Sequence, residues 1–131
     1  QRLPEMGTRV AALRDRLDSQ AMLRIAGARV NGQDPRLPTI SNLSFERLEG
    51  EAAVIAMDLE GVAISTGSAC SSGSLDPSHV LTAMGLRPEV VQSSLRFSLS
   101  YSTSEQEIDR ALQTLETVVQ RLRKLSTRVS I

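Results

Sequence analysis

Apolar residues recur at helical spacing in two long stretches of the chain. Met6, Val10, Leu13 and Leu17 are separated by four, three and four positions, which predicts an amphipathic helix over residues 6–18. A second helix is predicted from Glu105 to about Leu125, with Ser104 and Glu107 at capping-box spacing at its start. Its continuous apolar stripe consists of Ile108, Ala111, Leu112, Leu115, Val118, Val119, Leu122 and Leu125.

Alternating and short apolar runs between these helices predict strands. Residues 94–100 alternate strictly, so Leu95 and Phe97 are expected on one face and Arg96 on the other. Residues 39–45 alternate in the same way, with Leu43 and Phe45 on one face and Asn42 and Ser44 on the other. Further strands are expected over residues 23–30, where Leu23 and Ile25 share a face, and over 62–64.

The remaining segments predict two more helices. Residues 50–60 are strong helix formers and apolar nearly all round, which is typical of a buried helix, and Gly61 is expected to cap it in a left-handed conformation. Asp76 can N-cap another helix that ends at Gly85, and 88–92 is expected to add a short helical turn. This order predicts an α+β fold, in which helices pack on one face of a small, mostly antiparallel sheet.

Composition narrows the classes of function. The chain has 131 residues, the usual size of one domain, and 15 basic residues balance 15 acidic ones. This balance gives no electrostatic footprint for nucleic acid or an anionic membrane, and no apolar run approaches the roughly 20 residues that span a bilayer. A single cysteine excludes an internal disulfide and a cysteine-rich metal site. We therefore expect a cytoplasmic domain without a metal.

Residues 65–74 form a segment of Ser, Thr, Gly and Ala around the only cysteine, Cys70. No side chain in this segment could anchor it in a core, so the thiol is expected to be exposed and mobile, and nucleophilic once deprotonated. The alternative is an ordinary surface loop with an incidental cysteine. His79 could assist proton transfer from the base of the loop, or it could be a partly exposed helix residue.

Arg96 is the second candidate for chemistry. It lies on the polar face of a strand that follows the cysteine loop, and a guanidinium can bind a carboxylate with two hydrogen bonds. The alternative is a surface arginine in an ion pair. The only lysine, Lys124, falls in the last turn of the final helix, where it complements the helix C-terminus.

Five segments carry distinctive motifs: PTISNLSF (38–45), EGEAAVIAMDLEGVAISTGSAC (49–70), the cysteine segment through Gly85, SSLRFSLS (93–100) and TSEQEID (103–109). Together they resemble NifS/IscS-like cysteine desulfurases, which are class V aminotransferases of fold type I. The resemblance implies a pyridoxal-phosphate-dependent enzyme that converts L-cysteine to L-alanine. It implies that Cys70 accepts the sulfur as a persulfide and that Arg96 holds the substrate carboxylate. It also implies a homodimer and a sulfur-acceptor protein such as an iron–sulfur scaffold.

The chain departs from this family in what it lacks. Family members carry a large domain with the Schiff-base lysine and the phosphate-binding residues, and neither is found in this sequence. We therefore expect residues 1–131 to be the C-terminal small domain of such an enzyme, inactive alone and without bound cofactor. The alternatives are a non-enzymatic persulfide-relay or interaction module that displays Cys70, and a structural domain with no active thiol.

Overall fold

A four-stranded antiparallel sheet organises the chain. The computed structural model describes residues 2–32, 39–66, 90 and 92–129. The strands are β1 (Ala28–Val30), β2 (Ile40–Phe45), β3 (Ser65–Thr66) and β4 (Ser94–Ser98), in the spatial order β1-β2-β4-β3. All three pairings are antiparallel. The helices are α1 (Arg2–Arg24), α2 (Gly50–Leu59) and α5 (Glu105–Val129).

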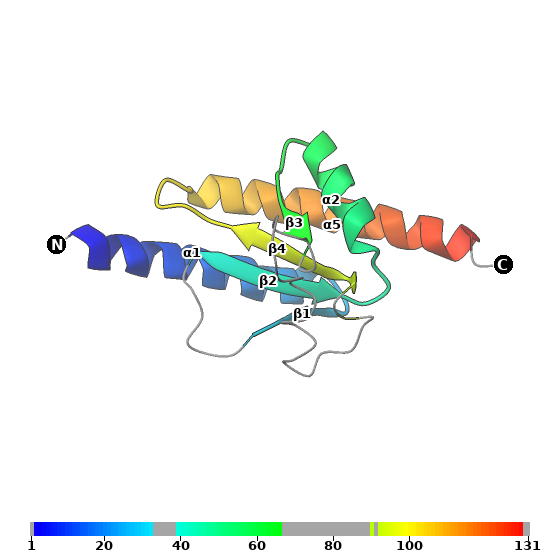
Figure 1. Ribbon diagram of the computed structural model, residues 1–131, viewed down its shortest axis with the longest axis horizontal. Helices are drawn as coiled ribbons and strands as arrows, with labels where there is room; N and C mark the ends of the chain where they lie inside the picture. The colour runs from blue at the N-terminus through cyan, green and yellow to red at the C-terminus, as the bar shows by residue number, and fades with distance from the viewer. Residues whose placement is uncertain (1, 33–38, 67–89, 91, 130–131) are drawn as a thin grey trace, which may run out of the picture.

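The helices cover one face of this sheet. In Figure 1, α1 and α5 run side by side and in the same direction behind the strands, and the two helices are in contact. α1 packs against β1 and β2, whereas α2 packs against α5 and the β3–β4 edge. The predicted α+β class, with an antiparallel sheet and helices on one face, is therefore confirmed.

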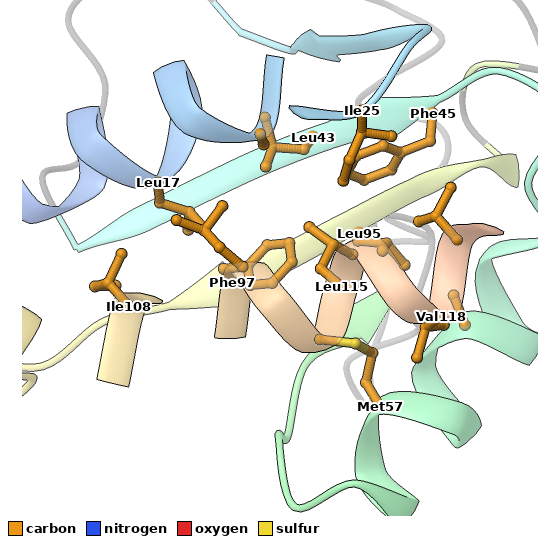
Figure 2. Close-up of a cluster of buried hydrophobic side chains, with 14 of the residues drawn as sticks. Leu17, Ile25, Leu43, Phe45, Met57, Leu95, Phe97, Ile108, Leu115 and Val118 are labelled. Atoms are coloured by element: carbon orange, nitrogen blue, oxygen red, sulfur yellow. The ribbon is translucent and has the colours of Figure 1, made fainter. Parts of the chain in front are cut away.

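The hydrophobic core lies between the sheet and the helices. Figure 2 shows Leu43 and Phe45 from β2, and Leu95 and Phe97 from β4, pointing toward side chains of the helices. Because strand side chains alternate between faces, Asn42, Ser44 and Arg96 point the other way. Ser41 is an exception among the polar residues of β2: it faces the helices, and its Oγ donates to Asp18 on α1. The fully buried core side chains include Val10, Leu17, Leu43, Phe45, Met57, Leu95, Leu112, Leu115, Val118 and Val119.

Both long helices form where the apolar periodicity predicts them, and the start of α5 is the predicted capping box. The backbone N–H of Glu107 donates to Ser104 Oγ at 3.1 Å, and the backbone N–H of Ser104 donates to Glu107 Oε1 at 2.8 Å. α1 extends through Arg24, so the prediction of a strand from Leu23 is wrong. Leu23 is 78% exposed on the helix, and the strand starts only at Ala28, after Gly27 turns the chain at φ +80°.

α2 forms as predicted, but its predicted burial is wrong. Gly61 follows it with φ +87°, as expected for a left-handed cap. Ala53 and Met57 are buried, whereas Ile55 and Leu59 are 63% and 81% exposed. The physical reason is position: α2 packs at the β3–β4 edge and against α5, so only one side of the helix is covered.

The strand that follows α2 is also displaced from its prediction. Residues 62–64 are irregular, and the strand comes at Ser65–Thr66, where the register pairs Ser65 with Arg96. The predicted helix over 76–85 lies outside the described residues. Within the described ranges, no helix is both long and apolar enough to cross a bilayer, and no cluster of His, Cys, Asp and Glu side chains could hold a metal.

Candidate functional site

The face of the sheet opposite the helices is lined with polar side chains. Side-chain alternation places on it residues of all four strands, and the register makes Asn42 a cross-strand neighbour of Arg96, Ser44 of Ser94, and Ser65 of Arg96. We call this surface the polar sheet face. Its members are Arg29, Asn42, Ser44, Ser65, Ser94, Arg96 and Ser98.

A hydrogen-bonded network centred on Asn31 fixes one half of the polar sheet face. The Asn31 Nδ2 group donates to Asn42 Oδ1 and to Ser94 Oγ, both at 3.1 Å, and Asn31 Oδ1 accepts from Ser44 Oγ at 3.3 Å. Ser94 Oγ in turn donates to the Val90 carbonyl at 2.7 Å. Asn31 is only 5% exposed. A buried network whose members are all satisfied is rigid, so the surface beside Arg96 is held in place.

The sequence pattern around Asn31 gives no sign of this role. The turn-forming tendency of Asn, together with the neighbouring Gly32, hides the fact that Asn31 directly follows β1. Its backbone N–H donates to the Asn42 carbonyl at 2.8 Å and so continues the pairing of β1 with β2. The alternation of β2, where Asn42 and Ser44 share a face, was the one available signal that a polar partner was needed there.

Arg96 lies at the centre of the polar sheet face, between β2 and β3. Its guanidinium Nε donates to Ser65 Oγ at 3.1 Å, and the residue is half-buried. The ion pairs among the described residues involve Arg14 and Arg16, so Arg96 is not paired with any described carboxylate. The alternative prediction of a surface ion pair at Arg96 is thus not seen in the described part of the chain.

The candidate nucleophile cannot be placed beside Arg96. Cys70 and His79 both lie outside the described residues, so their predicted roles stay predictions. β3 nevertheless ends at Thr66, four positions before Cys70, and β3 pairs directly with β4. The chain therefore enters the cysteine segment from the strand next to Arg96.

The described residues do not fit a covalent site for pyridoxal phosphate. Such a site needs a lysine amine that is shielded enough to react as the neutral base. Lys124 is the only lysine in the chain, and it is exposed on α5. α5 packs on the core face of the sheet, whereas Arg96 points from the opposite face. Lys124 and Arg96 therefore cannot serve one cofactor site.

A cavity of about 720 Å³ lies between β1, β2 and α2; Arg29 and Ser44 of the polar sheet face line it, and Arg96 does not. Arg29 and Arg47 line it together with Glu46 and Glu49, so its charges are mixed and favour no ligand of a single sign. Next to it, Arg123 donates from Nε and Nη2 to the Glu46 carbonyl at 3.0 and 2.7 Å. Burial, and then the nearby charge of Arg47, lower the pKa of Arg123. This cavity adds no group to the surroundings of Arg96.

Comparison with known proteins identifies relatives over most of the chain. The family model described as "Aminotransferase class-V" matches residues 4–111. The chain is 46% identical over 115 residues to a cysteine desulfurase of Nostoc sp., covering 87% of this chain and 29% of the relative. It is 44% identical over 120 residues to cysteine desulfurase NifS of Azotobacter vinelandii, covering 91% of this chain and 30% of the relative.

A solved structure shares the fold. A protein described as "NifS-like" superposes with a TM-score of 0.77 at 27% identity, covering 91% of this chain and 29% of its own. The chain thus spans less than a third of the length of the curated relatives that it matches.

Proposed function

We propose that this chain is the small domain of a longer cysteine desulfurase, because it belongs to the aminotransferase class-V family. The proposed reaction converts L-cysteine to L-alanine and transfers the sulfur to Cys70 as a persulfide. Two relatives that carry the name cysteine desulfurase, at 46% and 44% identity, support this activity. The isolated chain is proposed to be inactive.

The observation that carries the proposal is the state of Arg96. Its guanidinium lies on the polar sheet face, is half-exposed, and has no carboxylate partner among the described residues. A substrate carboxylate is the natural ligand for such a group, because a charge-assisted, bidentate pair fixes its orientation as well as its position. In the proposed enzyme, Arg96 therefore holds L-cysteine by the carboxylate.

Chain connectivity supports the proposed role of Cys70 as the sulfur acceptor. It follows Thr66 by four positions, and a chain of that length reaches at most about 14 Å when fully extended. Because β3 neighbours β4, the thiol of Cys70 is tethered within reach of a substrate bound at Arg96. In the proposed step, the Cys70 thiolate attacks the substrate sulfur, the S–S bond forms as the Cβ–S bond of L-cysteine breaks, and Cβ would be protonated to give L-alanine. The cofactor, when bound, would accept the electrons of the broken bond.

The cofactor is proposed to come from outside this chain. Lys124 is exposed on the far side of the sheet, so the Schiff-base lysine and the pyridoxal phosphate site are assigned to the rest of the enzyme. The proposed setting is the cytoplasm, with the enzyme as a homodimer. The persulfide is proposed to pass to an acceptor protein such as an iron–sulfur scaffold.

Mass spectrometry of the full-length parent protein tests the proposal. After incubation with L-cysteine, the peptide that contains Cys70 should gain one sulfur atom, and L-alanine should be released. The Cys70→Ser variant should form no persulfide while it keeps the absorption band of the bound cofactor. Normal sulfur transfer by Cys70→Ser would contradict the role of Cys70.

A second candidate function is a persulfide relay that makes no alanine. If the 131-residue chain works alone, the relay function is favoured, because the only lysine is exposed and does not fit a covalent site for the cofactor. Incubation of the chain with a separately purified desulfurase and L-cysteine distinguishes the two. A relay gains sulfur on Cys70 in proportion to the alanine made by the other enzyme. When that enzyme is omitted, a relay produces no alanine and gains no sulfur.

A further inference from the structure

The pairing of β3 with β4 gives Arg96 a neutral hydrogen-bond partner. Ser65 and Arg96 are direct cross-strand neighbours, and both side chains are half-buried on the polar sheet face. Arg96 Nε donates to Ser65 Oγ at 3.1 Å, which is normal hydrogen-bond geometry. Backbone pairing on both sides of β4 fixes the Cα positions of the two residues, so this contact does not depend on a loop conformation.

The contact uses one specific edge of the guanidinium. A carboxylate can bind an arginine either through Nε and one terminal nitrogen or through the two terminal nitrogens. Because Nε already donates to Ser65, the first of these modes is not available to a ligand. Asn42, the neighbour of Arg96 on β2, uses its Oδ1 as the acceptor for Asn31 Nδ2. Among the described residues, the terminal nitrogens of Arg96 thus keep their donors for a ligand.

We propose that Ser65 is a positioning residue, which orients Arg96 so that its two terminal nitrogens form the fork that binds the substrate carboxylate. The inference rests on the proposed function, because it takes Arg96 as the carboxylate ligand. A hydroxyl suits this role because it is neutral and holds the guanidinium without cancelling its charge. An Asp or Glu at position 65 would instead compete with the substrate for the same cation.

The test is a set of steady-state measurements on the full-length enzyme with L-cysteine as substrate. Ser65→Ala should raise KM about three- to tenfold, the loss expected for one hydrogen bond that acts through a charged group, with a smaller change in kcat. Ser65→Thr keeps the hydroxyl and should restore KM to within about twofold. Ser98→Ala is the matched control, because Ser98 is exposed on the same face of β4 and makes no hydrogen bond to Arg96.

A double-mutant cycle separates positioning from a general structural effect. If Ser65 acts through Arg96, then adding Ser65→Ala to Arg96→Ala should not raise KM further, whereas independent effects would multiply. The inhibition constant of L-alanine, which carries the carboxylate but no sulfur, should rise with Ser65→Ala by the same factor as KM. This readout does not depend on turnover of the inhibitor.

The remaining outcomes overturn the inference in distinguishable ways. An unchanged KM in Ser65→Ala, together with a raised KM in Arg96→Ala, refutes the role of Ser65 and leaves the proposed function intact. Equal losses in Ser65→Ala and Ser65→Thr, or multiplying effects in the double mutant, indicate a structural role and refute positioning. A wild-type enzyme without desulfurase activity refutes the proposed function, and the inference with it.

Discussion

Arg16 on α1 binds Asp109 on α5 with two hydrogen bonds from one edge of its guanidinium. Nε donates to Asp109 Oδ1 at 2.9 Å, and Nη2 donates to Oδ2 at 3.1 Å. The two residues are 93 positions apart in the chain, so the pair ties the first helix to the last. The hydrogen bond from Arg16 is the main reason that the pKa of Asp109 is lowered, with a further contribution from the charge of Arg16.

The lowered pKa of Asp109 predicts a pH dependence of stability. The folded state holds the carboxylate ionised at a pH where the unfolded chain begins to bind a proton. The pair therefore stabilises the fold fully above the unfolded pKa of about 3.9, and this contribution is lost as the pH falls through the folded value. Asp109→Asn should lower the free energy of unfolding at neutral pH. The difference from wild type should shrink as the pH falls below about 4.

Urea denaturation at several pH values measures this effect, and Glu116→Gln is its control. Glu116 lies on the same helix and forms no ion pair within the described residues. Because both residues of the pair are solvent-exposed, added salt should also reduce the effect of Asp109→Asn. A difference between wild type and Asp109→Asn that persists unchanged at pH 2–3 would contradict the assignment.

Gly50, the first residue of α2, is predicted to tolerate no side chain. A Cβ at this position would lie 2.6 Å from the carbonyl oxygen of Gln92 and 3.4 Å from that of Ser94. Both contacts are to backbone, which cannot rotate away, so the residues before β4 would have to shift. We expect Gly50→Ala to lower the free energy of unfolding by about 1–3 kcal/mol.

Gly7 provides the matched control for this substitution. It lies within α1, and a Cβ there would meet nothing within 4 Å. Gly7→Ala should therefore stabilise the chain by about 0.5–1 kcal/mol, because alanine is the better helix former. Urea denaturation midpoints that move in the same direction for Gly7→Ala and Gly50→Ala would contradict the close approach at Gly50.

One-sided packing of α2 predicts opposite sensitivities for two of its apolar residues. Met57 is fully buried and its side chain extends from α2 toward α5 (Figure 2), whereas Ile55 is 63% exposed on the same helix. Met57→Ala should cost about 2–5 kcal/mol, because it leaves a cavity in the core. Ile55→Ala should change the free energy of unfolding by less than about 0.5 kcal/mol. Similar midpoints in thermal or urea denaturation would show that α2 is covered on both sides.

The same helix shows which parts of the fold the sequence could predict. Apolar periodicity located α1 and α5 because each has a buried face, helix-forming residues located α2, and the capping box fixed the start of α5 at Glu105. Periodicity could not say how many sides of α2 are covered, because that depends on its place at the sheet edge. It also could not separate the end of α1 from the start of β1, since Leu23 and Ile25 suit either a strand or a helix end.

The sequence predicted only part of the candidate site, because some of its contacts depend on the order of the strands. The alternation of β4 placed Arg96 on the polar face, and this is confirmed by its hydrogen bond to Ser65. The roles of Ser65 and Asn31 depend on strand order, because they come from β3 and from the end of β1, which lie on opposite sides of the β2–β4 pair. Local sequence does not specify that order, so neither residue could be predicted as a neighbour of this surface.

Arg96→Ala, in the full-length enzyme, is predicted to raise KM for L-cysteine. Loss of a charge-assisted hydrogen-bonded pair costs about 1.5–3 kcal/mol, which corresponds to a rise of about ten- to a hundredfold in KM. Arg29→Ala is the control, because Arg29 also belongs to the polar sheet face but is exposed on the edge strand β1. Arg29 is displaced from Arg96 both across and along the sheet: two strand spacings separate β1 from β4, about 10 Å, and Arg29 pairs with Ser44, whose partner on β4 is Ser94 and not Arg96. Steady-state kinetics should therefore show a raised KM in Arg96→Ala alone, and equal changes in the two variants would indicate a diffuse effect of positive charge.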